Sequence, residues 1–76
     1  MEMMFRLFEN AFVQHGRGTL DDEGWHRYAE AVRYHFAHSP GVVEWWRGRR
    51  IPFGPSFSTW VEEQLAAAQE HAEVDR

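Results

Sequence analysis

Aromatic residues recur at helical spacing along this short chain, and they constrain its fold more than any other feature. Four tryptophans, two tyrosines and six phenylalanines occur among 76 residues. Because each ring buries a large apolar area, rings that share one helix face determine which helices pack together. We therefore predict an all-α fold, a small helical bundle of three main helices plus one short connecting helix. The rings expected to point inward are Phe5, Phe8, Phe12, Trp25, Tyr28, Phe36, Trp46, Phe57 and Trp60.

Glycines and acidic residues separate the first two helices. Gly16 and Gly18 supply the conformational freedom that ends a helix, and Thr19 followed by Asp22 is typical of an N-terminal capping box. The link is short, so the second helix should fold back antiparallel on the first. Asp22 and His26 are four residues apart and can pair on the helix surface. The predicted helices span residues 2–15 and 20–37.

Prolines mark the starts of the last two helices. Ser39 can cap the third helix and Pro40 can occupy its first position, while Pro55 opens the fourth. These helices are predicted over residues 40–49 and 55–73. All four belong to a single helical domain over residues 1–76.

Charge argues against nucleic acid as a partner, and composition excludes cysteine chemistry. The net charge is −4, all eight basic residues are arginine and cysteine is absent. A general nucleic-acid binder needs a basic surface, and disulfides and cysteine-bearing zinc sites need thiols. No apolar run approaches the roughly 18 residues of a membrane span, and the start has no signal-peptide pattern, so we expect a cytoplasmic protein.

A specific pattern extends over nearly the whole chain. It comprises Phe8-Glu9-Asn10-Ala11-Phe12-Val13-Gln14-His15, Gly18, Leu20-Asp21-Asp22-Glu23, Trp25, Pro40-Gly41, Trp45-Trp46, Arg49-Arg50, Phe53, Phe57 and Val61-Glu62. In this pattern the chain resembles the C-terminal half of a family of uncharacterised bacterial all-helical proteins. Family members are longer, with preceding helices and often an N-terminal membrane anchor. The resemblance implies a helical fold and brings no established activity, substrate or catalytic residues.

Histidine and serine positions form no combination typical of a metal site or an enzyme. Glu23 and His26 have the Glu-x-x-His spacing of di-iron bundles, but such a site needs a second pair. His35 and His38 could share only an adventitious cation. His15 lies on the aromatic face, where we expect a hydrogen-bonded packing role. The serines lie at helix starts, where capping explains them. We predict no catalytic residues, no metal and no cofactor.

The segment Trp45-Trp46-Arg47-Gly48-Arg49-Arg50 is the strongest candidate for a binding site. On a short helix only one of two adjacent tryptophans can point fully inward, so burial of Trp46 leaves Trp45 at the edge beside arginine. Tryptophan and arginine are enriched at binding hot spots. We predict a binding site for the acidic surface or phosphate of a partner, formed by Trp45, Arg47, Arg49 and Arg50.

An alternative interpretation keeps these arginines within the chain. Residues 27–50 sum to a charge of +3, between segments of −3 and −4 over residues 1–24 and 51–76. The arginines could therefore form intramolecular ion pairs with Glu62, Glu63 or the acidic first turn of the second helix.

The outer side of the first helix is a second candidate surface. Met3, Leu7 and Val13 lie away from the phenylalanine face, so this helix is apolar around more of its circumference than a surface helix should be. A second copy or a different protein would cover it.

Together these features predict a small acidic protein–protein interaction module without enzymatic activity. We expect it to self-associate as a homodimer through Met3, Leu7 and Val13, or to act as an inhibitor or antitoxin-like binding partner. The competing class is an anion or nucleic-acid binding module that uses the Trp-Trp-Arg-Gly-Arg-Arg segment.

Overall fold

The described part of the chain is entirely helical, which confirms the predicted all-α class. The computed structural model describes residues 1–49 and 52–74, with side chains as far as residue 70. Its elements are α1 (Glu2–Gly16), α2 (Asp22–His38), α3 (Pro40–Gly48) and α4 (Pro55–Val74), without a strand among the residues described. Each end lies within two residues of the predicted one. The short element is α3, which has nine residues.

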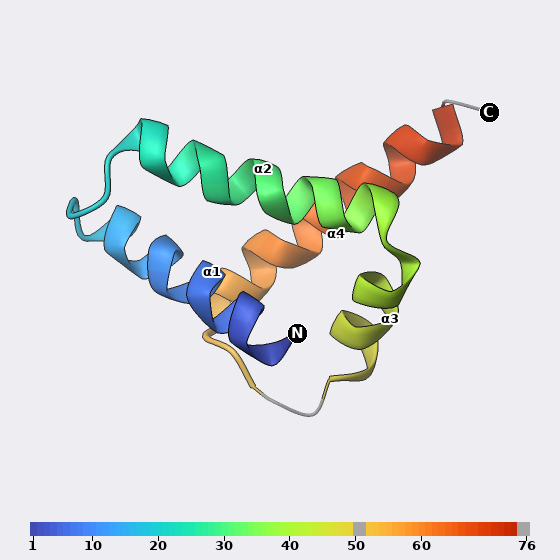
Figure 1. Cartoon of the computed structure of the whole chain (residues 1–76), viewed down its shortest axis with the longest axis horizontal. Helices are drawn as coiled ribbons and strands as arrows, with labels where there is room; N and C mark the ends of the chain where they lie inside the picture. Colours follow the sequence, from blue (N-terminus) through green and yellow to red (C-terminus); the bar gives the residue numbers. More distant parts are fainter. Residues whose placement is uncertain (50–51, 75–76) are drawn as a thin grey trace.

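Helix α2 is the central element of the bundle. It contacts each of the other three helices. Figure 1 shows α1 running antiparallel to α2, α4 crossing behind α2, and α3 below the C-terminal end of α2. Ala29, Val32 and Phe36 follow one another at spacings of three and four residues, and all three are buried. This single stripe therefore faces the shared core of the bundle.

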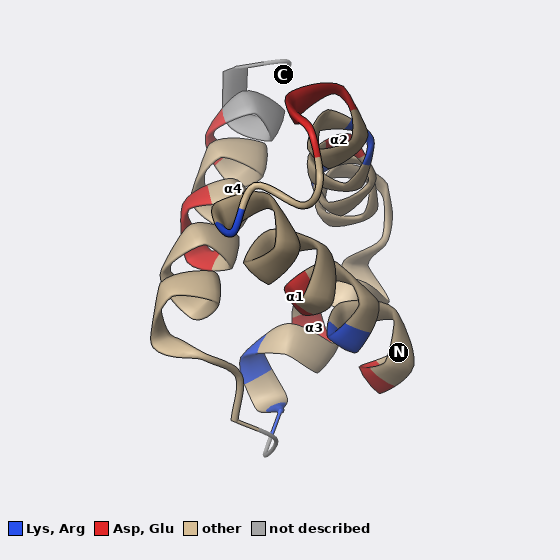
Figure 2. Cartoon of the chain, turned by 90° about the vertical axis from the view of Figure 1, so that its left-hand side faces the viewer, with Lys and Arg blue, Asp and Glu red and all other residues tan. Residues whose placement is uncertain are grey.

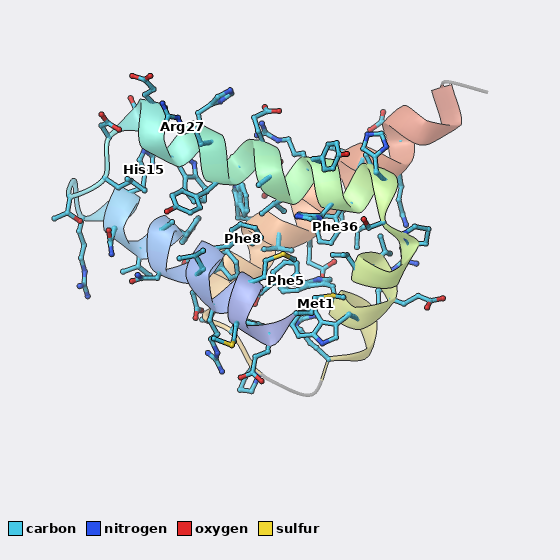
Figure 3. All side chains as sticks on the ribbon, viewed as in Figure 1. Met1, Phe5, Phe8, His15, Arg27 and Phe36 are labelled. Atoms are coloured by element: carbon cyan, nitrogen blue, oxygen red, sulfur yellow. The ribbon has the colours of Figure 1, made fainter. Side chains whose placement is uncertain are left out.

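The core is centred on the indole of Trp46. Its side chain is 0% exposed, and ring centroids of Phe5, Phe53 and Phe57 lie 5.3, 5.7 and 6.4 Å from it. The indole Nε1 donates a 2.8 Å hydrogen bond to Glu62, so the polar atom of this buried ring has a partner. Figure 3 shows the labelled rings Phe5 and Phe36 turned into the space between the helices.

A second aromatic cluster lies at the α1–α2 turn. Trp25 and Trp60 are partly buried, with ring centroids 4.9 Å apart, and Phe12 packs on both. Phe57 lies 5.6 Å from Phe12 and 6.4 Å from Trp46, so it joins the two clusters. Of the rings expected to point inward, five are buried and four are partly buried. The partly buried rings are Phe12, Trp25, Tyr28 and Trp60.

The predicted capping box is wrong. Asp21 is the N-cap residue of α2, and its carboxylate accepts a 2.8 Å hydrogen bond from the Gly24 amide. The Thr19 hydroxyl instead donates to the carbonyl of Gln14, 3.1 Å away, at the end of α1. Gly18, with φ of 80°, makes the turn between these two ends. The connection between α1 and α2 therefore covers residues 17–21, and α2 begins two residues later than the capping box required.

The start of α3 agrees only in part with its prediction. Pro40 occupies the first turn, as expected, and Ser39 holds the N-cap position. The Ser39 side chain, however, makes no capping hydrogen bond. The fixed φ of proline therefore favours the start of this helix, and the serine hydroxyl contributes no capping hydrogen bond.

Candidate functional site

Exposed apolar side chains are concentrated on α1. Within the described residues, Met1, Met3, Leu7 and Val13 are 51%, 85%, 52% and 39% exposed. The other large apolar side chain with comparable exposure is Tyr34 on α2, at 63%. The three residues expected to mediate self-association therefore do lie at the surface. Met1, the N-cap residue of α1, is exposed as well.

Helix geometry brings Met3 and Leu7 together but separates Val13 from them. Successive residues turn by about 100°, so Met3 and Leu7 lie one turn apart on one ridge, within about 40° of each other. Val13 lies about 120° from Leu7, on the other side of Asn10. The outer face of α1 therefore has an apolar ridge at its start and a separate apolar residue near its end.

Charged side chains border this face on one side. Arg6 lies 3.9 Å from Glu2 and 3.6 Å from Glu9, and its guanidinium covers the ring of Phe53 at 4.9 Å. Glu9 also accepts a 2.7 Å hydrogen bond from the Gly54 amide. The contacts of Arg6 with Phe53 and of Glu9 with Gly54 fasten α1 to the segment before α4. Sequence reasoning missed these two contacts because they join residues far apart in the chain.

Trp45 and Trp46 divide their roles as the helical spacing predicted, although Trp45 is less exposed than a free anchor would be. Trp46 is buried, whereas Trp45 is partly buried and stacks on Phe5 with ring centroids 5.1 Å apart. Trp45 also packs against the core cluster. Part of its ring area is therefore already used within the fold.

The arginine that stacks on a tryptophan does so on the buried one. The Arg49 guanidinium lies 3.5 Å from the ring centroid of Trp46, and its Nη1 donates a 2.6 Å hydrogen bond to the Trp46 carbonyl. Arg49 therefore seals the core, rather than stacking on the indole of Trp45. Arg47 is exposed, and Arg50 lies outside the described residues.

The predicted intramolecular ion pairs of this segment are not formed among the residues that the structure describes. Glu62 accepts from the Trp46 indole, and neither Arg47 nor Arg49 has a carboxylate of a described residue within ion-pair distance. Figure 2 shows acidic residues at the start of α2 and along α4, and basic residues at the end of α3. The basic end of α3 thus lies away from the acidic start of α2.

The histidine contacts are structural. His15 Nε2 lies 2.8 Å from the Asp22 carboxylate, and the ring stacks on Trp25 at 5.5 Å, which is the hydrogen-bonded packing role predicted for it. Asp22 therefore pairs with His15 and not with His26, which lies 3.7 Å from Glu30. No cluster of three or more metal-ligating side chains occurs in the described part of the chain.

A shallow hollow of about 300 Å³ lies between α2 and α4. Three alanines, Arg33 and Gln64 line it. Arg33 donates to Gln64 at 2.7 Å and to Glu30 at 2.9 Å, so its guanidinium is held at the rim. Such a lining offers apolar contact and no nucleophile, acid or base from the residues described there.

Comparisons with known proteins found no matching family model, no matching curated protein and no matching solved structure. Among the described residues, none of the helices combines the length and the apolar character needed to cross a membrane. The feature of the molecular surface that stands out is the exposed apolar side of α1.

Proposed function

We propose that this chain is a non-enzymatic protein–protein interaction module that self-associates through the outer face of α1. The observation that carries the proposal is the concentration of exposed apolar side chains on this one helix, led by Met3 at 85% and Leu7 at 52%. Large apolar side chains exposed together on one element are typical of a contact surface. Here the adjacent Met3 and Leu7 supply the core of that surface.

The energetics favour association that is weak and depends on concentration. Burying a side chain such as Leu7 or Met3 contributes roughly 1.5–3 kcal/mol relative to leaving it exposed. Part of that gain is offset by the loss of rotational and translational freedom on association. A chain of this size has a small hydrophobic core and therefore a low free energy of unfolding. A second copy that binds only the folded state would raise that free energy.

The test is sedimentation velocity over a range of protein concentrations, comparing the native chain with Leu7→Glu. We expect the native chain to show a mass above that of the monomer as concentration rises. Leu7→Glu should remain monomeric, because a buried, unpaired carboxylate opposes the contact. Tyr34→Glu is the matched control, since it places the same charge at a comparably exposed position of α2 and should leave association unchanged.

Helical circular dichroism must be retained in both variants, which the exposure of both positions predicts. A native chain that stays monomeric at millimolar concentration would overturn self-association. Equal loss of association in Leu7→Glu and Tyr34→Glu would show that net charge, and not the α1 face, controls it.

The second candidate partner for the outer face of α1 is a different protein. In that case the chain would act as an inhibitor or antitoxin-like partner. The resemblance to bacterial helical proteins names no partner. The alternative function is binding of an anion or nucleic acid by the Trp-Trp-Arg-Gly-Arg-Arg segment, for which exposed Arg47 is the supporting observation. Titration with an oligonucleotide at two salt concentrations separates the two functions, because phosphate binding weakens steeply with salt.

A further inference from the structure

We infer that the second copy docks on α1 in the antiparallel direction, with the two-fold axis of the dimer passing beside Asn10. This inference rests on the proposed self-association and specifies its symmetry and register. A two-fold dimer uses the same patch on both chains, so residues equally far from the axis on opposite sides must complement each other.

The spacing along α1 defines the contact ridge. Met3, Leu7, Asn10 and Gln14 follow one another at four, three and four residues, which is the repeat that keeps one side of a helix against a partner helix. Arg17, three residues further on, is the C-cap of α1, and its φ of −89° and ψ of −4° continue the helical conformation. All five are exposed. Asn10 is at the middle of this ridge, on the opposite side of α1 from the buried Phe5. Leu20 and Tyr28 adjoin the middle of this ridge, so a partner helix laid along it also contacts the α1–α2 turn and one side chain of α2.

The antiparallel register gives each exposed apolar side chain a suitable neighbour. About an axis at Asn10, Met3 lies level with Arg17 of the second copy. Leu7 lies level with Val13 of the second copy and about 1.5 Å along the helix from its Gln14, which shares the ridge with Leu7. Val13, which is off the ridge, comes beside Arg6 of the second copy on the same side of the interface. Long polar side chains cover apolar groups with their methylene stems and keep their polar ends in water. The register therefore uses the isolated Val13 as well as the ridge.

Charge selects this direction over the parallel one. The antiparallel register brings Glu2 beside Arg17 of the second copy at both ends of the contact. A parallel dimer would instead place Glu2 level with Glu2 and Arg17 level with Arg17, so each end of the contact would hold like charges. Arg17 forms no ion pair with a described residue of its own chain, and the side chain of Glu2 is 53% exposed. Antiparallel helix dipoles add to the same preference.

Asn10 suits the position on the axis. An amide side chain both donates and accepts, so two copies of Asn10 can form a reciprocal pair of hydrogen bonds. Within the described part of the chain, no hydrogen bond of the Asn10 side chain competes with that pair. A single asparagine at a contact position is an established way to fix the register of paired helices.

The expected dimer is weak because the contact is short. The 15 residues of α1 extend over about 22 Å. One helix of this length buries less than the roughly 800 Å² per partner of a standard stable interface. Covalent trapping of the dimer is therefore a better test than measurement of its lifetime.

The test is disulfide trapping with single-cysteine variants, which the native chain allows because it has no cysteine. Facing helices 8–10 Å apart place Cα atoms on the axis about 4–5 Å apart, within the roughly 4.4–6.8 Å range of disulfides. Asn10→Cys should therefore oxidise to a covalent dimer. Met3→Cys should not, because the two positions lie about 21 Å apart along the helices.

A mixed experiment completes the test. Met3→Cys mixed with Arg17→Cys should give a disulfide-linked heterodimer, while Tyr34→Cys reports random collision. Ready self-linking of Met3→Cys would mean a parallel dimer and would overturn the register. Linking of Asn10→Cys no faster than Tyr34→Cys, in a native chain that sedimentation shows to dimerise, would place the interface elsewhere. Failure of the inference is thus distinct from failure of self-association.

Discussion

At the residue scale, Trp46 shows how one side chain serves both packing and polar satisfaction. Its ring is fully buried among aromatic neighbours, and its single polar atom reaches out of the core to Glu62 at 2.8 Å. Arg49 closes the core over the same ring at 3.5 Å. Because a buried donor without a partner is costly, the Glu62 contact is worth more to the fold than its surface position indicates.

We predict that Glu62→Ala lowers the free energy of unfolding by about 1–3 kcal/mol, because it leaves the indole N–H of Trp46 without its acceptor. Glu62→Gln retains an acceptor oxygen and should stay close to the native value. Glu63→Ala is the matched control, since Glu63 is an exposed neighbouring glutamate. Urea denaturation followed by circular dichroism measures all three. Equal effects of Glu62→Ala and Glu63→Ala would mean that water replaces the carboxylate at no cost.

At the element scale, the start of α2 depends on a cap that the sequence pattern assigned to the wrong residue. Asp21 accepts from the Gly24 amide at 2.8 Å, and Asp22 is engaged by His15 at 2.8 Å. The two adjacent aspartates therefore have different roles. Asp21 caps the backbone of α2, whereas Asp22 binds a side chain of α1. The Asp21 carboxylate also lies where the helix dipole favours negative charge.

We expect Asp21→Ala to cost about 1 kcal/mol of stability, the usual effect of removing an N-cap side chain. Asp21→Asn keeps the capping oxygen and removes the charge, so it should cost less. Thermal or urea unfolding of the two variants separates the hydrogen bond from the electrostatic effect. If both variants lose the same stability, the charge of Asp21 stabilises α2 and its hydrogen bond does not.

The helix ends and the position of Arg49 show which features of the fold the sequence could predict and which it could not. Glycine and proline signals fixed the helix ends closely, because they act locally through backbone conformation. The exposure of Met3 and Leu7 followed from helical periodicity alone. The position of Arg49 did not, because α3 ends at Gly48 and the extended backbone of Arg49, with ψ of 142°, turns its guanidinium back over Trp46. Periodicity makes no statement about a residue beyond the helix end.

At the scale of the whole molecule, two aromatic clusters are joined into one core by a single ring. One cluster surrounds Trp46 near α3, and the other surrounds Trp25 and Trp60 at the opposite end of α2. Phe57 is 1% exposed and packs on Phe12, Trp60, Trp46 and Phe53. Coupling through such a ring predicts that the helices unfold together, as small domains usually do.

We predict that Phe57→Leu lowers the urea midpoint of unfolding by the same amount for both aromatic clusters. The substitution keeps most of the apolar volume and should cost no more than about 1.5 kcal/mol, so the variant remains folded. In a Trp25→Phe/Trp60→Phe background, fluorescence reports only Trp45 and Trp46, while circular dichroism reports all the helices. Urea midpoints from the two probes should coincide, with and without Phe57→Leu. Because Phe57 contacts both clusters, a fluorescence midpoint that stays constant while the helical midpoint falls would show that α3 and its tryptophans form an independent unit.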